Sequence, residues 1–281
     1  MSPLLSISRQ QEIGKIYKSK DRIDSQLFPN EASSIRIVSF ILRAYMQRKS
    51  ILSCFLIGML IFSWSTVANC ALERDFQTWI NITAIGNSHS DNKFLSRLRY
   101  WLEDQERLGD DSSRFSQILL RPGLGYALTD NLSIWIGYAW IYTGKPNTPN
   151  PFEEDRIWQQ LLWIKTNQYL TFTSRTRAEQ RFLENNPKTA YRLRQLIKIS
   201  VPLKHFNKMS FVTSDEVFLH KNNFVGTNSS GFDQNRYFVG VGYKINPWLN
   251  TEMGYMNQYI RRFGVPDFLA NIVSLNFFLN F

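Results

Sequence analysis

Apolar and polar residues alternate with a period of two along residues 71–281, in segments of ten or more residues. In the clearest segment, LSIWIGYAWIY (132–142), every second residue from Leu132 onward is aliphatic or aromatic, and Ser133, Gly137 and Ala139 lie between them. Successive side chains of a strand point to opposite faces. An apolar, aromatic face opposite a face of Arg, Gly and Ser is typical of transmembrane β-barrel strands, whose polar face is enclosed.

Eleven such segments are separated by turns rich in Asn, Asp, Pro and Gly. Tight connections such as 129–131 alternate with longer ones such as 144–151 and 221–233, as in bacterial outer-membrane barrels. Because those barrels usually have an even strand count, we predict an all-β fold with a single antiparallel transmembrane β-barrel of about 12 strands (range 10–12), the missing strand lying before residue 115. The expected strands are 75–85, 94–103, 115–128, 132–142, 154–165, 169–183, 188–202, 209–220, 234–245, 248–259 and 269–281.

The chain also contains an internal repeat. GLGYALTDNL followed by IGY, within 123–138, matches GVGYKINPWL followed by MGY, within 240–255, without a gap. We interpret each copy as a β-hairpin about a tight turn. Both glycines of each Gly-x-Gly then lie on one strand face and leave room inside for bulky neighbours, an interpretation we favour over a phosphate-binding loop.

Residues 46–70 have the three parts of an export signal: a cationic start, an apolar core and small residues. The core is too short to cross ~30 Å of hydrocarbon comfortably. We expect a signal peptide cleaved after Ala68 or Cys70, with a lipoprotein at Cys70 and an uncleaved anchor as alternatives. Residues 1–45 are then a leader upstream of the true start at Met46, or disordered, and residues 71–281 are the barrel.

The leader changes the meaning of the net charge of +10. Residues 1–70 hold nine Lys and Arg and four Asp and Glu, so residues 71–281 carry a net charge of +5. This balance argues against a nucleic-acid partner. Both cysteines, Cys54 and Cys70, belong to the signal region, so no internal disulfide is expected in the barrel, and we expect no cofactor.

The last segment ends in LNFFLNF (275–281), in which Phe277, Leu279 and Phe281 share the outward face. A terminal strand of this kind, with a final aromatic residue, indicates the signal read by the outer-membrane barrel-assembly machinery; the alternative is an ordinary last strand of a soluble sheet. With the export signal, it predicts the outer membrane of a Gram-negative bacterium. Outer-membrane lipid, lipopolysaccharide and the assembly machinery are the expected partners.

Basic residues gather on the enclosed faces of several expected strands, and we call this set the basic ladder. An outward Arg at mid-membrane depth costs about 2–4 kcal/mol, which favours inward placement. The ladder indicates either a path or site for a small anionic solute, or a plug of Arg–carboxylate pairs, and the sequence leaves both open. The ladder comprises Arg97, Arg99, Arg175, Arg177, Arg181, Arg192, Arg194 and Lys198, with Glu103, Glu179 and Glu252 as compensating acids.

A rim-active lipid hydrolase or acyltransferase is the alternative to a channel or structural barrel. His220 is expected at the outer end of a strand with Glu216 on the same face, so a Ser–His–Glu set with Ser214 is conceivable. No G-x-S-x-G elbow occurs, and three scattered histidines do not suggest a metal site. We therefore expect no enzyme activity. A soluble periplasmic sandwich is a third possibility.

Several segments together resemble a bacterial family called domain of unknown function 2490. They are DFQTW (75–79), RTRAEQRF (175–182), YRLRQL (191–196), NRYFVGVGYKIN (235–246), EMGYMNQY (252–259) and the terminal aromatic strand. The resemblance covers roughly residues 74–281 and implies an outer-membrane barrel, similar to porins in shape alone. It implies no catalytic or binding residue.

Overall fold

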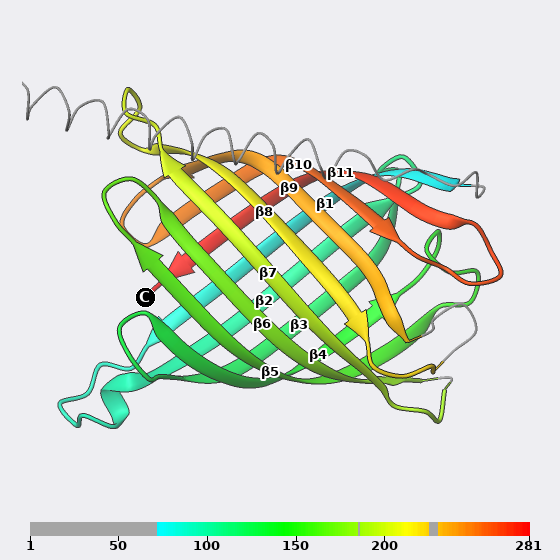
Figure 1. Ribbon diagram of the computed structural model, residues 1–281, viewed down its shortest axis with the longest axis horizontal. Helices are drawn as coiled ribbons and strands as arrows, with labels where there is room; N and C mark the ends of the chain where they lie inside the picture. Colours follow the sequence, from blue (N-terminus) through cyan, green and yellow to red (C-terminus); the bar gives the residue numbers. More distant parts are fainter. Residues whose placement is uncertain (1–71, 185, 225–229) are drawn as a thin grey trace, which may run out of the picture. The chain divides into compact units, whose positions relative to one another are not determined.

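The computed structural model describes residues 72–184, 186–224 and 230–281, which form a closed β-barrel (Figure 1). The expected leader and export signal, and hence the cleavage site, lie outside the described residues. The elements are β1 (Leu72–Asn87), the 3₁₀ turn η1 (Leu95–Arg97), β2 (Leu98–Gly109), β3 (Arg114–Ala127), β4 (Leu132–Thr143), β5 (Phe152–Thr166), β6 (Thr171–Leu183), β7 (Ala190–Pro202), β8 (Met209–His220), β9 (Gly231–Lys244), β10 (Leu249–Ile260) and β11 (Asp267–Asn280).

Each strand pairs antiparallel with its neighbour in sequence, and β1 pairs with β11 to close the barrel. This last pair is parallel and runs from Leu72 opposite Asp267 to Ile85 opposite Asn280. Each strand of a meander reverses the one before, so an odd strand count leaves the first and last strands pointing the same way. The barrel therefore has eleven strands, within the predicted range, and the twelfth strand expected before residue 115 does not occur in the described chain.

Ten of the predicted segments agree with the observed strands to within a few residues, and β2 departs most. It covers 98–109 rather than 94–103. Asn92 caps the preceding turn, its Oδ1 accepting from the backbone N–H of Phe94 at 2.8 Å and of Leu95 at 3.3 Å. The strand then continues through the charged run EDQER (103–107), beyond the predicted end of the strand at residue 103.

The connections fall into two groups, one at each end of the barrel (Figure 1). The turn end carries the tight turns after β3, β5, β7 and β9, together with the last residue of β11. The loop end carries the longer connections after β4, β8 and β10, together with the start of β1. Two connections break the rule: 88–97 is long at the turn end, and 110–113 is tight at the loop end.

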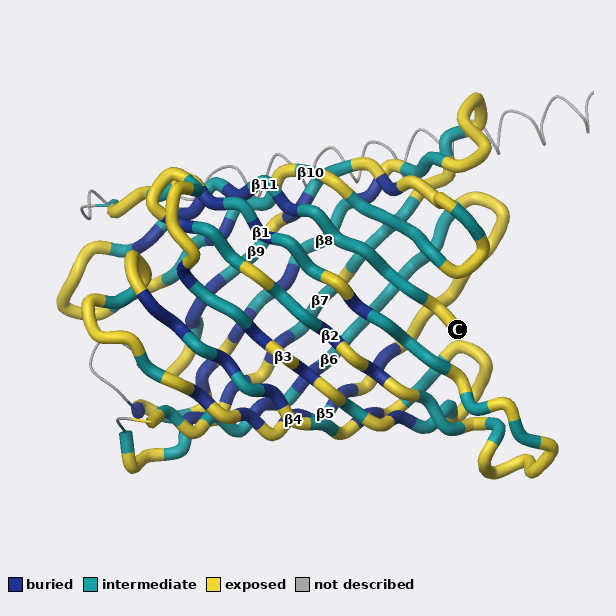
Figure 2. The backbone as a smooth tube through the Cα atoms, turned by 180° about the vertical axis from the view of Figure 1, so that it is seen from behind, coloured by how far each residue is buried: buried dark blue, intermediate teal, exposed yellow. Residues whose placement is uncertain are grey.

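Buried and exposed residues alternate along the strands (Figure 2). Many large apolar side chains are exposed on the outer surface, and many polar and charged side chains are buried inside. Leu124, Ile136 and Met253, all on the outer face, are about 60 % exposed (58 %, 58 % and 61 %). Toward the loop end, outward aromatic residues carry polar partners: Trp140 Nε1 donates to Glu153 at 3.0 Å and the Tyr255 hydroxyl to Asn271 at 2.6 Å. Rings with an apolar body and a hydrogen-bonded tip suit a boundary between hydrocarbon and water.

The repeated hairpins are β3–β4 and β9–β10, and each holds a facing pair of glycines. Gly123 lies opposite Gly137, and Gly240 opposite Gly254. A Cβ on Gly137 would lie 2.4 Å from the ring of Trp158, because that indole lies flat against the glycine pair. The predicted purpose of these glycines, room for bulky inner side chains, is confirmed.

Trp158 belongs to an apolar cluster on the inner faces of β2–β5. This cluster was not predicted from the sequence, because the enclosed strand faces were described as Arg, Gly and Ser. Trp101, Trp135 and Trp158 meet edge to face, with ring centroids 5.5 and 6.4 Å apart. The inner faces of β2–β5 therefore include an aromatic wall, formed by Trp101, Trp135 and Trp158, beside charged residues, and the inner faces of β6–β8 are mainly charged.

Replacement of Gly137 by Ala should destabilise the barrel, because the new Cβ would overlap both the Trp158 ring and the carbonyl oxygen of Pro122. Overpacking of this kind costs typically 1–3 kcal/mol. We expect a lower midpoint in the temperature dependence of heat-modifiable gel migration. Gly86→Ala is the matched control, since its Cβ would meet the Tyr100 ring at an ordinary 3.6 Å; equal midpoints for the two variants would refute the packing argument.

Candidate functional site: a buried arginine–carboxylate network

The middle of the barrel interior is filled by arginine and glutamate side chains from β2, β3 and β5–β8. Of the basic ladder, Arg175, Arg177, Arg181, Arg192 and Arg194 lie on the inner faces of β6 and β7. Arg177 is fully buried, and Arg192 and Arg194 are 7 % and 5 % exposed. These arginine side chains are charged and largely buried. A buried charge is costly unless it is paired, so each guanidinium needs an anion or a hydrogen-bond acceptor beside it.

Glu179 is the centre of the network. Its Oε2 accepts from Arg192 Nε at 2.9 Å and Nη2 at 2.6 Å, and its Oε1 accepts from Arg194 Nη1 at 2.8 Å. The pairing register of β6 and β7 sets Glu179 opposite Arg192 and Arg177 opposite Arg194. Like charges opposite each other, as Arg177 and Arg194 are, destabilise a sheet, and Glu179 offsets this by accepting from Arg194.

Glu216 extends the network to β8. Its Oε1 accepts from Arg194 Nε and Nη2 at 3.1 and 2.9 Å and from Arg175 Nη2 at 2.8 Å. Arg194 thus bridges two buried carboxylates, Glu179 and Glu216. Both ion pairs involve charge-assisted hydrogen bonds, the stronger kind.

Glu154 holds a second pair of arginines that face each other, Arg156 on β5 and Arg181 on β6. Each guanidinium makes a bidentate contact with the carboxylate, from 2.5 to 2.9 Å. Arg121 on β3 pairs with Glu103 on β2 through one nitrogen, its Nη1 donating to the two carboxylate oxygens at 2.8 and 2.7 Å. Trp101 Nε1 and Gln105 Nε2 also donate to Glu103.

Arg177 has no carboxylate partner among the described residues. Its Nε and Nη2 donate to Gln160 Oε1 at 2.9 and 2.6 Å, and its Nη1 is buried without a hydrogen-bond partner. Its guanidinium lies 4.8 Å from the ring centre of Trp158 and 5.9 Å from that of Trp101. Trp101 belongs to β2, four strands away, so this contact links opposite walls of the barrel.

The remaining ladder residues lie elsewhere. Lys198 Nζ reaches across from β7 to Glu252 Oε1 on β10 at 2.5 Å, toward the turn end. Arg97 is a correction: β2 begins at Leu98, so Arg97 lies in η1, exposed, and donates to the carbonyl oxygen of Leu128. Arg99, at the start of β2, donates to the carbonyl oxygens of Ser96 and Leu98 and joins no ion pair in the described part of the chain.

Sequence reasoning missed half of the network. For several residues a signal was present, because they lie two positions from another inward residue on an expected strand, as Glu154 does from Arg156. Arg107 and Asp233 lie outside the expected strands, and Glu216 was considered only for a Ser–His–Glu set. The network residues not assigned to the basic ladder or its acids are Arg107, Arg121, Arg156, Arg236, Glu154, Glu216 and Asp233.

His220 is buried at the loop end of β8, where its Nε2 lies 3.2 Å from Asp233 Oδ2 and 3.3 Å from Arg181 Nη1. Ser214 is six residues away along the strand, about 20 Å at the usual rise of ~3.3 Å per residue. Glu216 is engaged by two arginines. The Ser–His–Glu set considered from the sequence is therefore not brought together.

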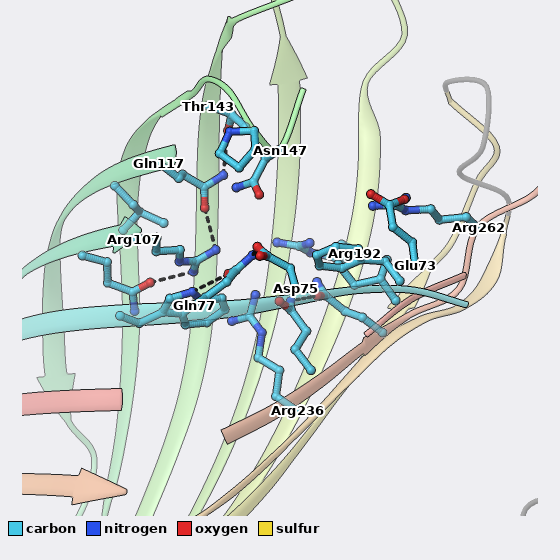
Figure 3. A pocket seen from close by; sticks show the side chains of 18 of the residues that line it. Glu73, Asp75, Gln77, Arg107, Gln117, Thr143, Asn147, Arg192, Arg236 and Arg262 are labelled. Atoms are coloured by element: carbon cyan, nitrogen blue, oxygen red, sulfur yellow. Dashed lines mark hydrogen bonds and ion pairs between the residues drawn. The ribbon is translucent and has the colours of Figure 1, made fainter. Parts of the chain in front are cut away.

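Two cavities lie on either side of the network. The loop-end cavity, of about 380 Å³, is lined by arginines from several walls (Figure 3). The turn-end cavity measures about 580 Å³. Trp79, Gln105, Arg121, Arg194 and Arg236 line both, so these five side chains mark the layer where the cavities meet.

The described residues include no group of three or more His, Cys, Asp and Glu side chains that could hold a metal ion. Within the same residues, no helix is long and apolar enough to cross a membrane.

Comparisons with known proteins point to one family. Residues 76–268 match the model of a family described as a protein of unknown function (DUF2490). An uncharacterized protein of Methylorubrum extorquens is 32 % identical over 211 residues, which cover 74 % of this chain and 89 % of that protein. Among solved structures, outer-membrane expressed OmpT of Vibrio cholerae matches with a TM-score of 0.35 and 13 % identity, over 59 % of this chain and 56 % of that one. On the extent of the family match and of the relative, the chain belongs to the DUF2490 family.

Proposed function

We propose that this chain is an outer-membrane β-barrel that forms a narrow pore, closed at its middle by the arginine–carboxylate network and anion-selective when the network opens. The closed barrel and its apolar outer face support a location in lipid, because every backbone polar group of a closed sheet is paired. We extend the proposal to the outer membrane of a Gram-negative bacterium, with lipid and lipopolysaccharide around the apolar surface.

The burial of the central charges is the observation that carries this function. Glu103, Arg121, Arg177 and Glu179 are at most 2 % exposed. Side chains that line a water-filled channel keep water on their inward surface, as in barrels of 16–18 strands. Here the same positions contact one another, which supports a closed interior over an open one.

Contacts between distant strands support the same conclusion. Arg177 on β6 reaches Trp101 on β2, and Lys198 on β7 reaches Glu252 on β10. Arg236 on β9 lies 4.9 Å from the ring centre of Trp79 on β1. Each of these contacts joins strands that are three or four apart around the barrel, so together they cross the interior in several directions.

The charge balance of the interior supports anion preference. Nine arginines face five acids there, so guanidinium charge is in excess. A basic ring of this kind favours anions over cations. The nine are Arg107, Arg121, Arg156, Arg175, Arg177, Arg181, Arg192, Arg194 and Arg236, and the five are Glu103, Glu154, Glu179, Glu216 and Asp233.

Shortening Arg177 to Ala should open a conductance that the wild type lacks, because it removes a fully buried bridge between opposite walls. In planar bilayers we expect the wild type to be nearly silent and Arg177→Ala to pass a steady current that prefers chloride over potassium. Arg97→Ala is the matched control, since Arg97 is an exposed arginine in η1. A large steady wild-type current, or identical traces for all three proteins, would contradict the closed interior.

Glu179→Gln should strongly lower the free energy of unfolding, because the buried guanidiniums of Arg192 and Arg194 lose the carboxylate that they share. Breaking a buried ion pair costs about 3–5 kcal/mol. Glu252→Gln should cost less, since the Lys198–Glu252 pair is partly exposed, at 23 % and 14 % of the two side chains. The midpoint of heat-modifiable migration measures both variants; a larger loss for Glu252→Gln would argue against the central role of Glu179.

A further inference from the structure

The loop-end cavity has more guanidinium charge than its acids can neutralise. We propose that it binds a phosphate group, held by Arg107 and Arg236 beside the ring of Trp79. This inference rests on the proposed function, because it assigns a ligand class to the same basic interior. Figure 3 shows Arg107, Arg192 and Arg236 approaching the cavity from different strands.

The three acids that line this cavity are already engaged. Glu73 pairs with Arg262 at 2.6 Å, and Asp110 pairs with Arg114 at 3.1 Å. Asp75 accepts from Gln77 Nε2 at 2.7 Å and from the backbone N–H groups of Asp110 and Asp111, at 3.3 and 3.2 Å. In the described part of the chain, none of the three forms an ion pair with Arg107 or Arg236.

Arg107 is the first uncompensated cation. Its guanidinium donates to the neutral amide oxygens of Gln117 at 2.5 Å and Gln105 at 2.8 Å, and lies 3.8 Å from the ring centre of Trp79. Its Nε is buried and has no hydrogen-bond partner. In the described part of the chain no carboxylate pairs with it, so a donor and a full charge remain for a ligand.

Arg236 is the second. It lies 4.9 Å from the ring centre of Trp79 and 4.7 Å from that of Phe218, and the side-chain amide of Gln258 is 3.1 Å from its Nε and Nη2. Again no carboxylate among the described residues pairs with it. Arg107 and Arg236 come from β2 and β9, on either side of β1, and both lie against Trp79.

The other arginines of the cavity share carboxylates behind its surface. Arg156 and Arg181 share Glu154, Arg192 and Arg194 share Glu179, and Arg121 has Glu103. Arg107 and Arg236 are thus the inner arginines of this cavity that have no carboxylate partner in the described part of the chain.

A phosphate monoester matches this surplus in charge and geometry. It carries ≈ −1.5 to −2 charges near pH 7 and three acceptor oxygens, so it can neutralise both guanidiniums at once. Guanidinium forks bind phosphate bidentately, whereas a carboxylate supplies one charge and would leave one arginine uncompensated. The volume of about 380 Å³ accommodates the phosphate with a small organic group or with ordered water.

Two sources could supply such a group: a phosphate in solution or a phosphorylated lipid headgroup. We expect inorganic phosphate, titrated calorimetrically into the detergent-solubilised full barrel at low ionic strength, to bind saturably. Lipid A mixed into the micelle forms the second arm, read as a shift of the thermal midpoint. Saturable binding of inorganic phosphate assigns the site to a soluble ligand, and a midpoint shift with lipid A alone assigns it to a headgroup.

Arg107→Gln and Arg236→Gln should each weaken phosphate binding about tenfold, because each removes a charge-assisted contact. Arg261→Gln is the control, since Arg261 is an exposed arginine in the loop-end connection after β10 and does not line the cavity. If the Gln variants fail to fold, Arg107→Lys and Arg236→Lys retain the charge without the fork and should weaken binding severalfold. Wild-type protein that binds neither probe, or Arg107 and Arg236 variants that bind as Arg261→Gln does, would overturn the proposal.

The binding and conductance experiments fail independently. Phosphate binding with no current in Arg177→Ala refutes the closed pore and retains the site. A current in Arg177→Ala with no phosphate binding refutes the site and retains the pore.

Discussion

Closure of the sheet is the constraint on which the other features depend. An open edge in hydrocarbon would leave backbone N–H and C=O groups unpaired, at several kcal/mol each, so the first strand must pair with the last. Eleven strands satisfy this through parallel pairing of β1 with β11. Closure then encloses one face of every strand, and that enclosed face is where the charged residues lie.

The barrel interior is narrow, and this limits how the enclosed charges can be arranged. Each buried guanidinium needs an anion or hydrogen-bond acceptors, because an isolated buried charge is costly. Glu154, Glu179 and Glu216 each serve two arginines, and this sharing draws together side chains of the four strands β5–β8. The aromatic wall of Trp101, Trp135 and Trp158 fills the opposite side, so the interior is packed by two different kinds of side chain.

The same sharing explains the uneven charge at the loop end. Arg107 and Arg236 are held by aromatic rings and neutral amides instead of carboxylates. Ring faces and amide oxygens stabilise a guanidinium without cancelling its charge. Among the described residues, arginines without a carboxylate partner are therefore more numerous toward the loop end, where Arg107 and Arg236 lie, than at the centre, where Arg177 lacks one.

The sequence alone determined the barrel, the position of nearly every strand and the inward face of the arginines on β6 and β7. These follow from alternation, which a single strand expresses without its neighbours. Tertiary structure decided the strand count. An even number is only the usual count in outer-membrane barrels. The odd count depends on the pairing of Leu72–Ile85 with Asp267–Asn280, a contact between the first and last strands. Tertiary structure also decided which acid serves which arginine. Glu216 on β8 meets Arg175 on β6 because strand pairing places both opposite Leu196 of β7, and register across three strands is not written in any one of them.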